Sequence, residues 1–120
     1  MTLSAVLAIS SHEYAGISDA VRTGPGITVR GNSSNLRRAL RLVRKTEPDL
    51  FIMEMGLADH QTLDAIRSAR EKGTTHVVVL CRKRRTGNAV VALEAGASGY
   101  LFSDTPALDV VQALESIAKR

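Results

Sequence analysis

The residues best suited to chemistry in this chain follow short apolar segments. Glu54 comes directly after the apolar run 50–53, where an ionised carboxylate needs water or a charged partner. Glu54 is therefore either a solvated loop acid or part of a functional site, and its position favours both interpretations equally. Other polar side chains also follow apolar runs: Ser10, Ser11, Cys81, Arg82 and Ser103.

Cysteine and histidine indicate no further site. Cys81 is the sole cysteine of the sequence, which excludes an internal disulfide and a thiolate zinc cage and fits a reducing cytoplasm. The neighbouring Arg82 would favour a reactive thiolate, but a lone cysteine at the end of a buried strand is more often inert packing. The three histidines lack metal-ligand spacing, so we expect no metal site and no cofactor.

The apolar segments also predict the scaffold that positions these side chains. They are short, rich in β-branched residues and without alternation, as in strands buried on both faces. Segments with helical spacing separate them, which predicts an α/β fold with a doubly wound, five-stranded parallel sheet. The predicted strands contain residues 6–9, 27–29, 50–53, 77–80 and 100–102. Their carboxyl ends share one edge of the sheet, where ligands bind in such folds.

Length and composition limit the class of protein. We expect one domain over residues 1–120, because the chain is 44% hydrophobic and shows no linker. No apolar run is long enough to cross a membrane, and no basic region precedes the first apolar run as in an export signal, so we expect no membrane association and a cytoplasmic location. A net charge of +4 points weakly to an anionic partner.

Three blocks of the sequence resemble the receiver domain of two-component response regulators. They are Glu47–Glu54, Val77–Cys81 and Ala92–Leu101. The resemblance implies a flavodoxin-like receiver fold with strand order 2-1-3-4-5. Ala-Gly-Ala-Ser-Gly-Tyr-Leu, followed by Asp104-Thr105, is most similar to the subfamily with a C-terminal LuxR-type helix-turn-helix. A DNA-binding output domain, absent from this chain, is therefore an expected partner.

The resemblance also shows where this chain departs from the family's metal and phosphoacceptor positions. The acidic pair that holds Mg²⁺ in the family aligns with Ser10 and Ser11, and the phosphoacceptor Asp aligns with Glu54. Mg²⁺ prefers hard, usually anionic oxygens, so one remaining carboxylate is a poor site. The extra methylene of Glu54 moves the nucleophilic oxygen by about 1.5 Å, which matters for an in-line displacement.

The remaining positions of the family's pocket differ as well. Cys81 stands where the family has a Thr or Ser hydroxyl, and Arg82 replaces the small residue that follows it. Ser103 replaces the Lys that contacts the phosphoryl oxygens, while the aromatic switch position is retained as Tyr100. We therefore expect a degenerate phosphoacceptor pocket in a receiver that is not phosphorylated.

Two interpretations of Glu54 remain. Its longer side chain could imitate a phosphorylated Asp, although it carries one charge against about −1.5 to −2 for a phosphate. Alternatively the pocket is a structural remnant in which Arg82 or Lys83 pairs with Glu54. We favour the second interpretation, because a partly buried carboxylate without a cation is costly.

Local charge and capping patterns add two hypotheses. The run Arg82–Arg85 is either a solvated loop or an anion contact. Four basic residues share one face of the helix predicted after residue 35, which is most simply a water-facing surface. These four are Arg37, Arg41, Arg44 and Lys45. Ser10-x-x-Glu13 matches a capping box, in which serine and glutamate satisfy free amides at a helix start.

The sequence as a whole predicts a non-catalytic regulatory module. No nucleophile and base pair, metal cluster or cofactor loop can be assembled, so we expect no enzyme. We expect a homodimer through the fourth helix, the fifth strand and the last helix. With Val90, Val91, Tyr100 and Val111, these elements carry more apolar side chains than one layer can bury. A protein partner or a small ligand is the other expected regulator. The alternative function is a stand-alone basic module that binds nucleic acid or protein.

Overall fold

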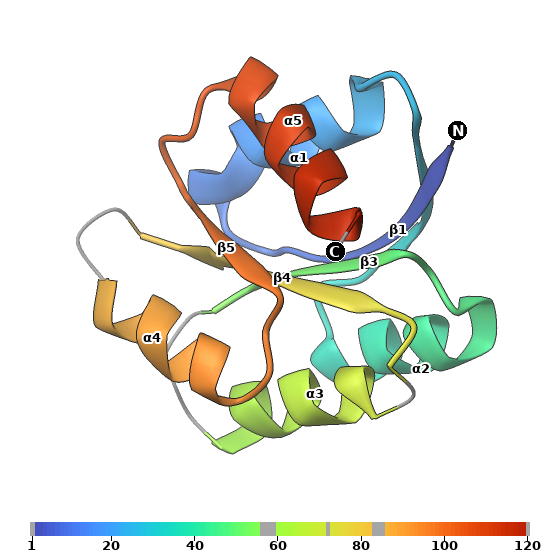
Figure 1. The fold of residues 1–120 in the computed structure, drawn as a ribbon, viewed down its shortest axis with the longest axis vertical. Coiled ribbons are helices and arrows are strands. Elements are labelled where there is room, and N and C mark those ends of the chain that lie inside the picture. The colour runs from blue at the N-terminus through green and yellow to red at the C-terminus, as the bar shows by residue number, and fades with distance from the viewer. Residues whose placement is uncertain (1, 56–59, 72, 83–85, 120) are drawn as a thin grey trace.

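A computed structural model describes residues 2–55, 60–71, 73–82 and 86–119. Strands and helices alternate along the chain (Figure 1). The strands are β1 (Leu3–Ala8), β2 (Ile27–Asn32), β3 (Leu50–Glu54), β4 (His76–Cys81) and β5 (Gly99–Phe102). The helices are α1 (Ala15–Thr23), α2 (Leu36–Thr46), α3 (His60–Arg70), α4 (Thr86–Glu94) and α5 (Ala107–Ala118), with a short 3-10 turn η1 (His12–Tyr14) before α1.

The five strands form one parallel sheet in the order β2-β1-β3-β4-β5. This confirms the predicted doubly wound α/β fold and its strand order. The helices α1 and α5 cover one face of the sheet, and α2, α3 and α4 cover the other (Figure 1). The strands that the sequence marked most strongly, β1, β3 and β4, are the three central ones. Their carboxyl ends are therefore neighbours.

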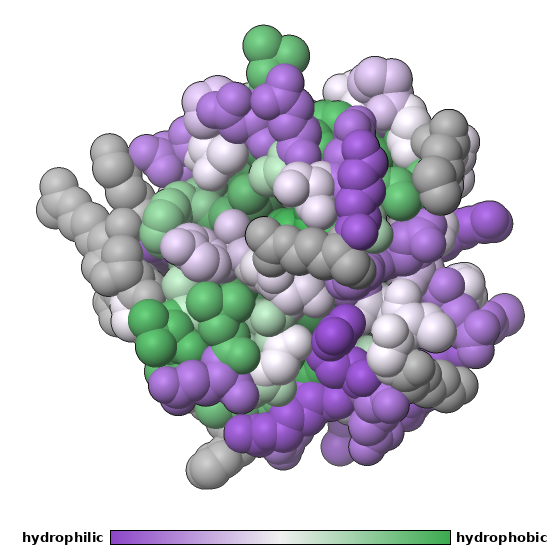
Figure 2. Space-filling view, in the orientation of Figure 1, coloured by the Kyte–Doolittle hydropathy of each residue, from purple (hydrophilic) through white to green (hydrophobic). Residues whose placement is uncertain are grey.

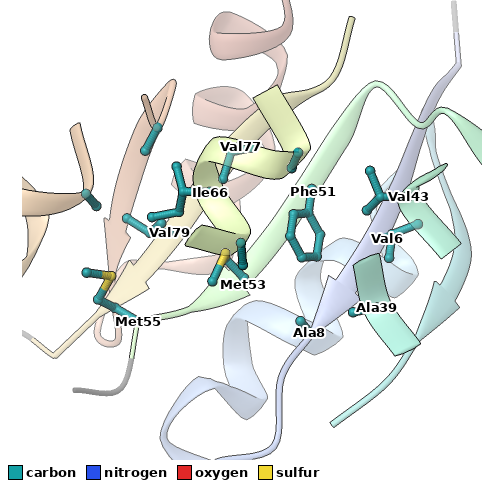
Figure 3. Close-up of a cluster of buried hydrophobic side chains, with 14 of the residues drawn as sticks. Val6, Ala8, Ala39, Val43, Phe51, Met53, Met55, Ile66, Val77 and Val79 are labelled. Atoms are coloured by element: carbon teal, nitrogen blue, oxygen red, sulfur yellow. The ribbon is translucent and has the colours of Figure 1, made fainter. Parts of the chain in front are cut away.

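Alternate residues of the central strands enter two separate hydrophobic cores. Phe51 and Met53 pack under α2, α3 and α4, and Figure 3 shows the Phe51 ring among Val6, Val43 and Met53. Leu50 and Ile52 of the same strand pack against α1 and α5 on the opposite face. Burial on both faces explains why these strands lack the polar alternation of a half-exposed sheet.

The amino-terminal ends of β1 and β3 are tied by side-chain hydrogen bonds. Asp49 Oδ2 accepts from the backbone N–H of Ser4 at 2.8 Å and from the Ser4 hydroxyl at 3.2 Å. The backbone N–H of Asp49 in turn donates to Ser4 Oγ at 3.0 Å. These contacts support the register in which Ala8 pairs with Met53, one residue before Glu54.

None of the helices in the described ranges is both long enough and apolar enough to span a bilayer.

Replacing Phe51 with alanine tests the core under α2, α3 and α4. Phe51 is fully buried, so Phe51→Ala should lower the free energy of unfolding by about 3–5 kcal/mol, through lost transfer energy and a cavity. Leu108→Ala is the matched control, because Leu108 is 81% exposed and its truncation should change stability by less than about 0.5 kcal/mol. Urea unfolding followed by circular dichroism measures both, and equal effects would contradict the described core.

Candidate functional site

The carboxyl edge of the sheet brings the predicted site residues together from four strands. Glu54 ends β3 and is half-buried, and Cys81 ends β4 and is buried. Ser10 lies two residues after β1, and the backbone N–H of Ser103, just after β5, donates to the carbonyl of Cys81 at 2.9 Å. The edge at which the sequence placed a site is therefore one continuous region.

Glu54 is held by the chain that follows β1. Glu54 Oε1 accepts hydrogen bonds from the backbone N–H of Ser10 and from the Ser10 hydroxyl, the latter at 2.6 Å. Hydrogen bonds to an ionised acceptor are stronger than neutral ones. These two bonds supply the partner that a half-buried carboxylate needs, and they join the ends of β1 and β3.

Arg82 pairs with Glu13 instead of Glu54. Arg82 Nη2 lies 2.6 Å from Glu13 Oε1, and the two side chains are 61% and 39% exposed. The expectation that Arg82 neutralises Glu54 is therefore wrong. Glu54 is already satisfied by Ser10, and a pair at the surface keeps its hydration, so it avoids the desolvation cost of a buried one. Lys83, the other predicted partner of Glu54, and the rest of the basic loop to Arg85 lie outside the described residues.

The helix start after β1 is capped by Ser11, not by Ser10. Ser11 is the N-cap of η1, and its hydroxyl accepts from the backbone N–H of Glu13 at 3.3 Å. The predicted capping box of Ser10 and Glu13 is therefore wrong in both partners. The Ser10 hydroxyl donates to Glu54, and the Glu13 carboxylate faces Arg82.

Tyr14 is a site neighbour that the sequence did not reveal. It is 4% exposed. Burial raises the pKa of Tyr14 to about 12, helped by the electrostatic influence of Glu13, Cys81 and Glu54 and opposed by that of Arg82. Its spacing with Ile17 signalled a buried helix position. Nothing in that spacing indicated that the ring lies within electrostatic range of the carboxyl edge.

Cys81 is 1% exposed, and burial raises the pKa of its thiol. The thiol therefore stays protonated at neutral pH, although Arg82 is its neighbour in sequence. This favours the packing interpretation of Cys81 over the redox-sensitive one.

Tyr100 faces outward from β5. It is 42% exposed and contacts Phe102 edge to face, with ring centroids 5.4 Å apart and an interplanar angle of 64°. The retained aromatic is thus part of the surface beside α4 and not of the polar cluster around Glu54.

The oxygen donors at this edge fit Mg²⁺ poorly. Glu54 supplies one carboxylate, Ser10 and Ser11 supply neutral hydroxyls, and the Glu13 carboxylate is engaged by Arg82. Mg²⁺ favours octahedral sites with anionic oxygens. Over residues 2–55, 60–71, 73–82 and 86–119, no three side chains of His, Cys, Asp or Glu gather in a group that could hold a metal ion.

Comparison with known proteins places the chain among signalling domains. Residues 13–115 match the model of the response regulator receiver domain. The nitrate/nitrite response regulator protein NarL of Escherichia coli is 29% identical over 116 residues, which cover 94% of this chain and 54% of that protein. A putative transcriptional regulator of Pseudomonas aeruginosa is 34% identical over 103 residues, 82% of this chain and 49% of the relative. The chain thus spans about half the length of these curated relatives.

Solved structures confirm the receiver fold. The signal receiver domain of the putative response regulator NarL from Mycobacterium tuberculosis superposes with a TM-score of 0.85 at 20% identity, over 98% of this chain and 97% of that one. A LuxR-family two-component response regulator from Aurantimonas gives a TM-score of 0.83 at 27% identity, over 99% and 86% of the two chains.

The pKa of Tyr14 gives a prediction for alkaline pH. The folded state keeps Tyr14 protonated up to about pH 12, whereas the unfolded chain releases this proton near 10. The contribution of Tyr14 to stability is therefore complete below pH 10 and lost as the pH rises from 10 to 12. Tyr14→Phe should remove this component of the alkaline loss of stability.

Absorbance of the ionised phenol tests the same assignment directly. In Tyr100→Phe, Tyr14 is the remaining tyrosine, since the sequence has two, and its phenol should titrate at about pH 12. Titration of that variant near pH 10 would contradict the burial of Tyr14 beside the site.

Proposed function

The chain belongs to the response regulator receiver family, and from this premise we propose that it is a non-catalytic regulatory domain that acts without being phosphorylated. The observation that carries the proposal is the hydrogen bonding of Glu54. Its Oε1, at the position of the family's phosphoacceptor, accepts from both the backbone and the hydroxyl of Ser10. These two bonds fix the orientation of the carboxylate and reduce the negative charge density on Oε1, which disfavours in-line attack on phosphorus.

Neutral side chains at the positions of the family's metal-binding acids support the proposal. Ser10 and Ser11 stand where the resemblance requires acids, and they are used in local hydrogen bonds to Glu54 and to the start of η1. The nearest substitute, Glu13, pairs with Arg82. A phosphoryl group would therefore arrive without the divalent cation that normally offsets its charge.

The residues at the positions of the family's hydroxyl and lysine also support the proposal. Cys81 is buried and protonated, and a thiol is a weak hydrogen-bond donor. Ser103 is neutral, so it cannot replace the positive charge of a lysine. Among the described residues, these two positions therefore offer a thiol and a neutral hydroxyl beside a carboxylate that Ser10 holds.

We infer that Glu54 is a structural anchor and not an imitation of a phosphorylated residue. Imitation requires the negative charge to be presented to the group that follows β4. Cys81 offers no hydroxyl there, and the Glu54 oxygen is directed to Ser10. The Arg82–Glu13 pair joins the segment after β4 to η1, a contact that forms without a phosphoryl group.

We propose that the domain controls transcription as part of a longer protein. The similar proteins include a nitrate/nitrite response regulator, a transcriptional regulatory protein of Bacillus subtilis and a LuxR-family regulator. The matched segments make up about half of the first two proteins, which leaves room for an output domain that binds DNA. Such regulators act in the cytoplasm, which suits a domain with one reduced cysteine.

Self-association through α4, β5 and α5 is the proposed means of control. Val90 is 55% exposed, and Leu93 and Tyr100 are each 42% exposed. Figure 2 shows hydrophobic side chains gathered over α4. Val91 and Val111, the other two side chains expected on this surface, are half-buried. A shallow groove beside Leu93, Tyr100 and Ile117 continues the surface onto α5, and a second copy of the chain would cover it.

The second candidate function is a stand-alone module that binds nucleic acid or protein through its basic side chains. The observation in its favour is the basic face of α2. Association through an apolar surface is little affected by salt, whereas binding of nucleic acid weakens steeply with salt. A dimer that persists at high salt therefore supports the first function, whereas a monomer that only binds nucleic acid supports the second.

Phosphotransfer from a small-molecule donor tests the central proposal. With Mg²⁺ and ³²P-labelled acetyl phosphate, the chain should acquire no label on Glu54. Glu54→Asp should also remain unlabelled, since Ser10 and Ser11 still lack the carboxylates for the metal. Glu54→Gln is the matched control, because label that persists in this variant lies elsewhere. Stoichiometric label that Glu54→Gln abolishes would overturn the proposal.

Sedimentation velocity tests the proposed dimer. The chain should sediment as a dimer at micromolar concentration, and Val90→Asp with Tyr100→Asp should shift it to monomer by placing charges in the apolar contact. Thr28→Asp, exposed on the far edge strand β2, is the control and should remain dimeric. Glu54→Gln should also remain dimeric if Glu54 is only an anchor. A strict monomer would exclude this surface.

A further inference from the structure

One helix of this chain carries a dense positive charge. The 11 residues of α2 contain five basic side chains and no acidic one. The remainder of the chain holds eleven Lys and Arg against twelve Asp and Glu, so α2 accounts for the whole surplus. The five basic residues are Arg37, Arg38, Arg41, Arg44 and Lys45.

These side chains form a continuous face. At 3.6 residues per turn they fall within an arc of about 120°, opposite the buried Ala39 and Val43. All five are exposed. None takes part in the ion pairs found between described residues, and the Arg44 guanidinium donates to a neutral group, Ser68 Oγ, at 2.9 Å. Like charges three and four residues apart repel, so this face destabilises the isolated helix and favours an anionic partner.

The basic face continues into a hollow beside the edge strand. Arg38, Arg41 and Lys45 line an open depression of about 400 Å³ together with Asn32, the last residue of β2, and Ser33, which follows it. The Asn32 amide and the Ser33 hydroxyl add two neutral hydrogen-bond donors to the three cationic side chains. This combination is typical of contacts to phosphate oxygens. The part of the surface that α2 occupies is hydrophilic in Figure 2.

We propose that this α2 face binds the phosphate backbone of duplex DNA. An 11-residue helix is about 16 Å long, the axial rise of about five base pairs. A membrane surface is a poorer fit, because the large exposed hydrophobic side chains among the described residues lie on α4, β5 and α5, and none is available on α2 to enter a bilayer. Single strands are also a poorer fit, because α2 carries no aromatic side chain on which bases could stack.

The proposal extends the proposed function, in which an output domain brings DNA close to this domain. Contacts to phosphates position a protein on DNA without reading its sequence. Tethering makes such a second contact intramolecular, so even weak binding by α2 would strengthen the whole complex. The affinity of the whole protein for DNA would then depend on whether the α2 face lies against the DNA or away from it.

Binding of the chain itself to labelled duplex DNA tests the proposal. Fluorescence anisotropy with a duplex of about 20 base pairs of arbitrary sequence should show binding at low salt. Contact with four phosphates gives a log–log salt slope of about −3.6, a loss of affinity of about 10²-fold between 50 and 200 mM salt. No binding at low salt would overturn the proposal.

Matched variants separate the α2 face from net charge. Arg37→Glu with Arg41→Glu should weaken binding by more than about tenfold, and the milder Arg37→Gln with Arg41→Gln should reduce the slope by about 2. The control, Arg22→Glu with Lys119→Glu, changes the same net charge on exposed residues of α1 and the end of α5, on the other side of the sheet. It should retain most of the affinity. Equal weakening by both charge-reversed pairs would overturn the proposal.

Two further outcomes are distinguishable. Polyglutamate that competes as well as unlabelled duplex would assign the face to acidic polypeptides and overturn the DNA proposal. The assay uses no phosphoryl donor, so failure here leaves the phosphorylation-independent function intact. Label on Glu54 would likewise leave the α2 face untouched.

Discussion

The arrangement of side chains at the carboxyl edge depends on the hydrogen bonds from Ser10 to Glu54. A parallel sheet brings the ends of β1, β3 and β4 together, and a carboxylate on β3 must find its partners there. In this chain the partner is the neighbouring backbone and a serine hydroxyl, not a cation. The carboxylate is thereby satisfied within the protein. The same hydrogen bonds therefore account for both proposed losses, that of metal binding and that of phosphoryl transfer.

The charges around Glu54 are arranged in local pairs. Arg82 is engaged by Glu13 at the surface, and burial of the nearby Tyr14 raises the pKa of its phenol to about 12. The charge on α2 is arranged in the opposite way, with basic side chains exposed and without carboxylate partners among the residues described. If, as we propose, the strand edge is inert, the functional surfaces of the domain are its helical faces, with α2 for an anionic partner and α4 with β5 for an apolar one.

The sequence predicted the scaffold well because burial on both faces leaves a strong signal. The unbroken apolar runs before Glu54 and Arg82 identified the central strands, and their alternation with helices determined the strand order once the family resemblance was seen. Pairing at the edge was less predictable. A one-residue difference decides whether Ser10 or Ser11 caps the turn, and the choice of Glu13 over Glu54 by Arg82 depends on side-chain reach and hydration. Neither is encoded in spacing, and the same holds for the position of the Tyr14 ring.

Binding of Mg²⁺ together with beryllium fluoride, a phosphoryl analogue that needs no covalent transfer, tests the central claim most directly. The ¹H–¹⁵N NMR signals of Ser10, Ser11 and Met55 report on the end of β1 and on the residue after Glu54. Our account predicts that millimolar Mg²⁺ and the analogue leave these signals no more shifted than that of Thr28 on the distant edge strand. Saturable shifts confined to Ser10, Ser11 and Met55 would contradict it.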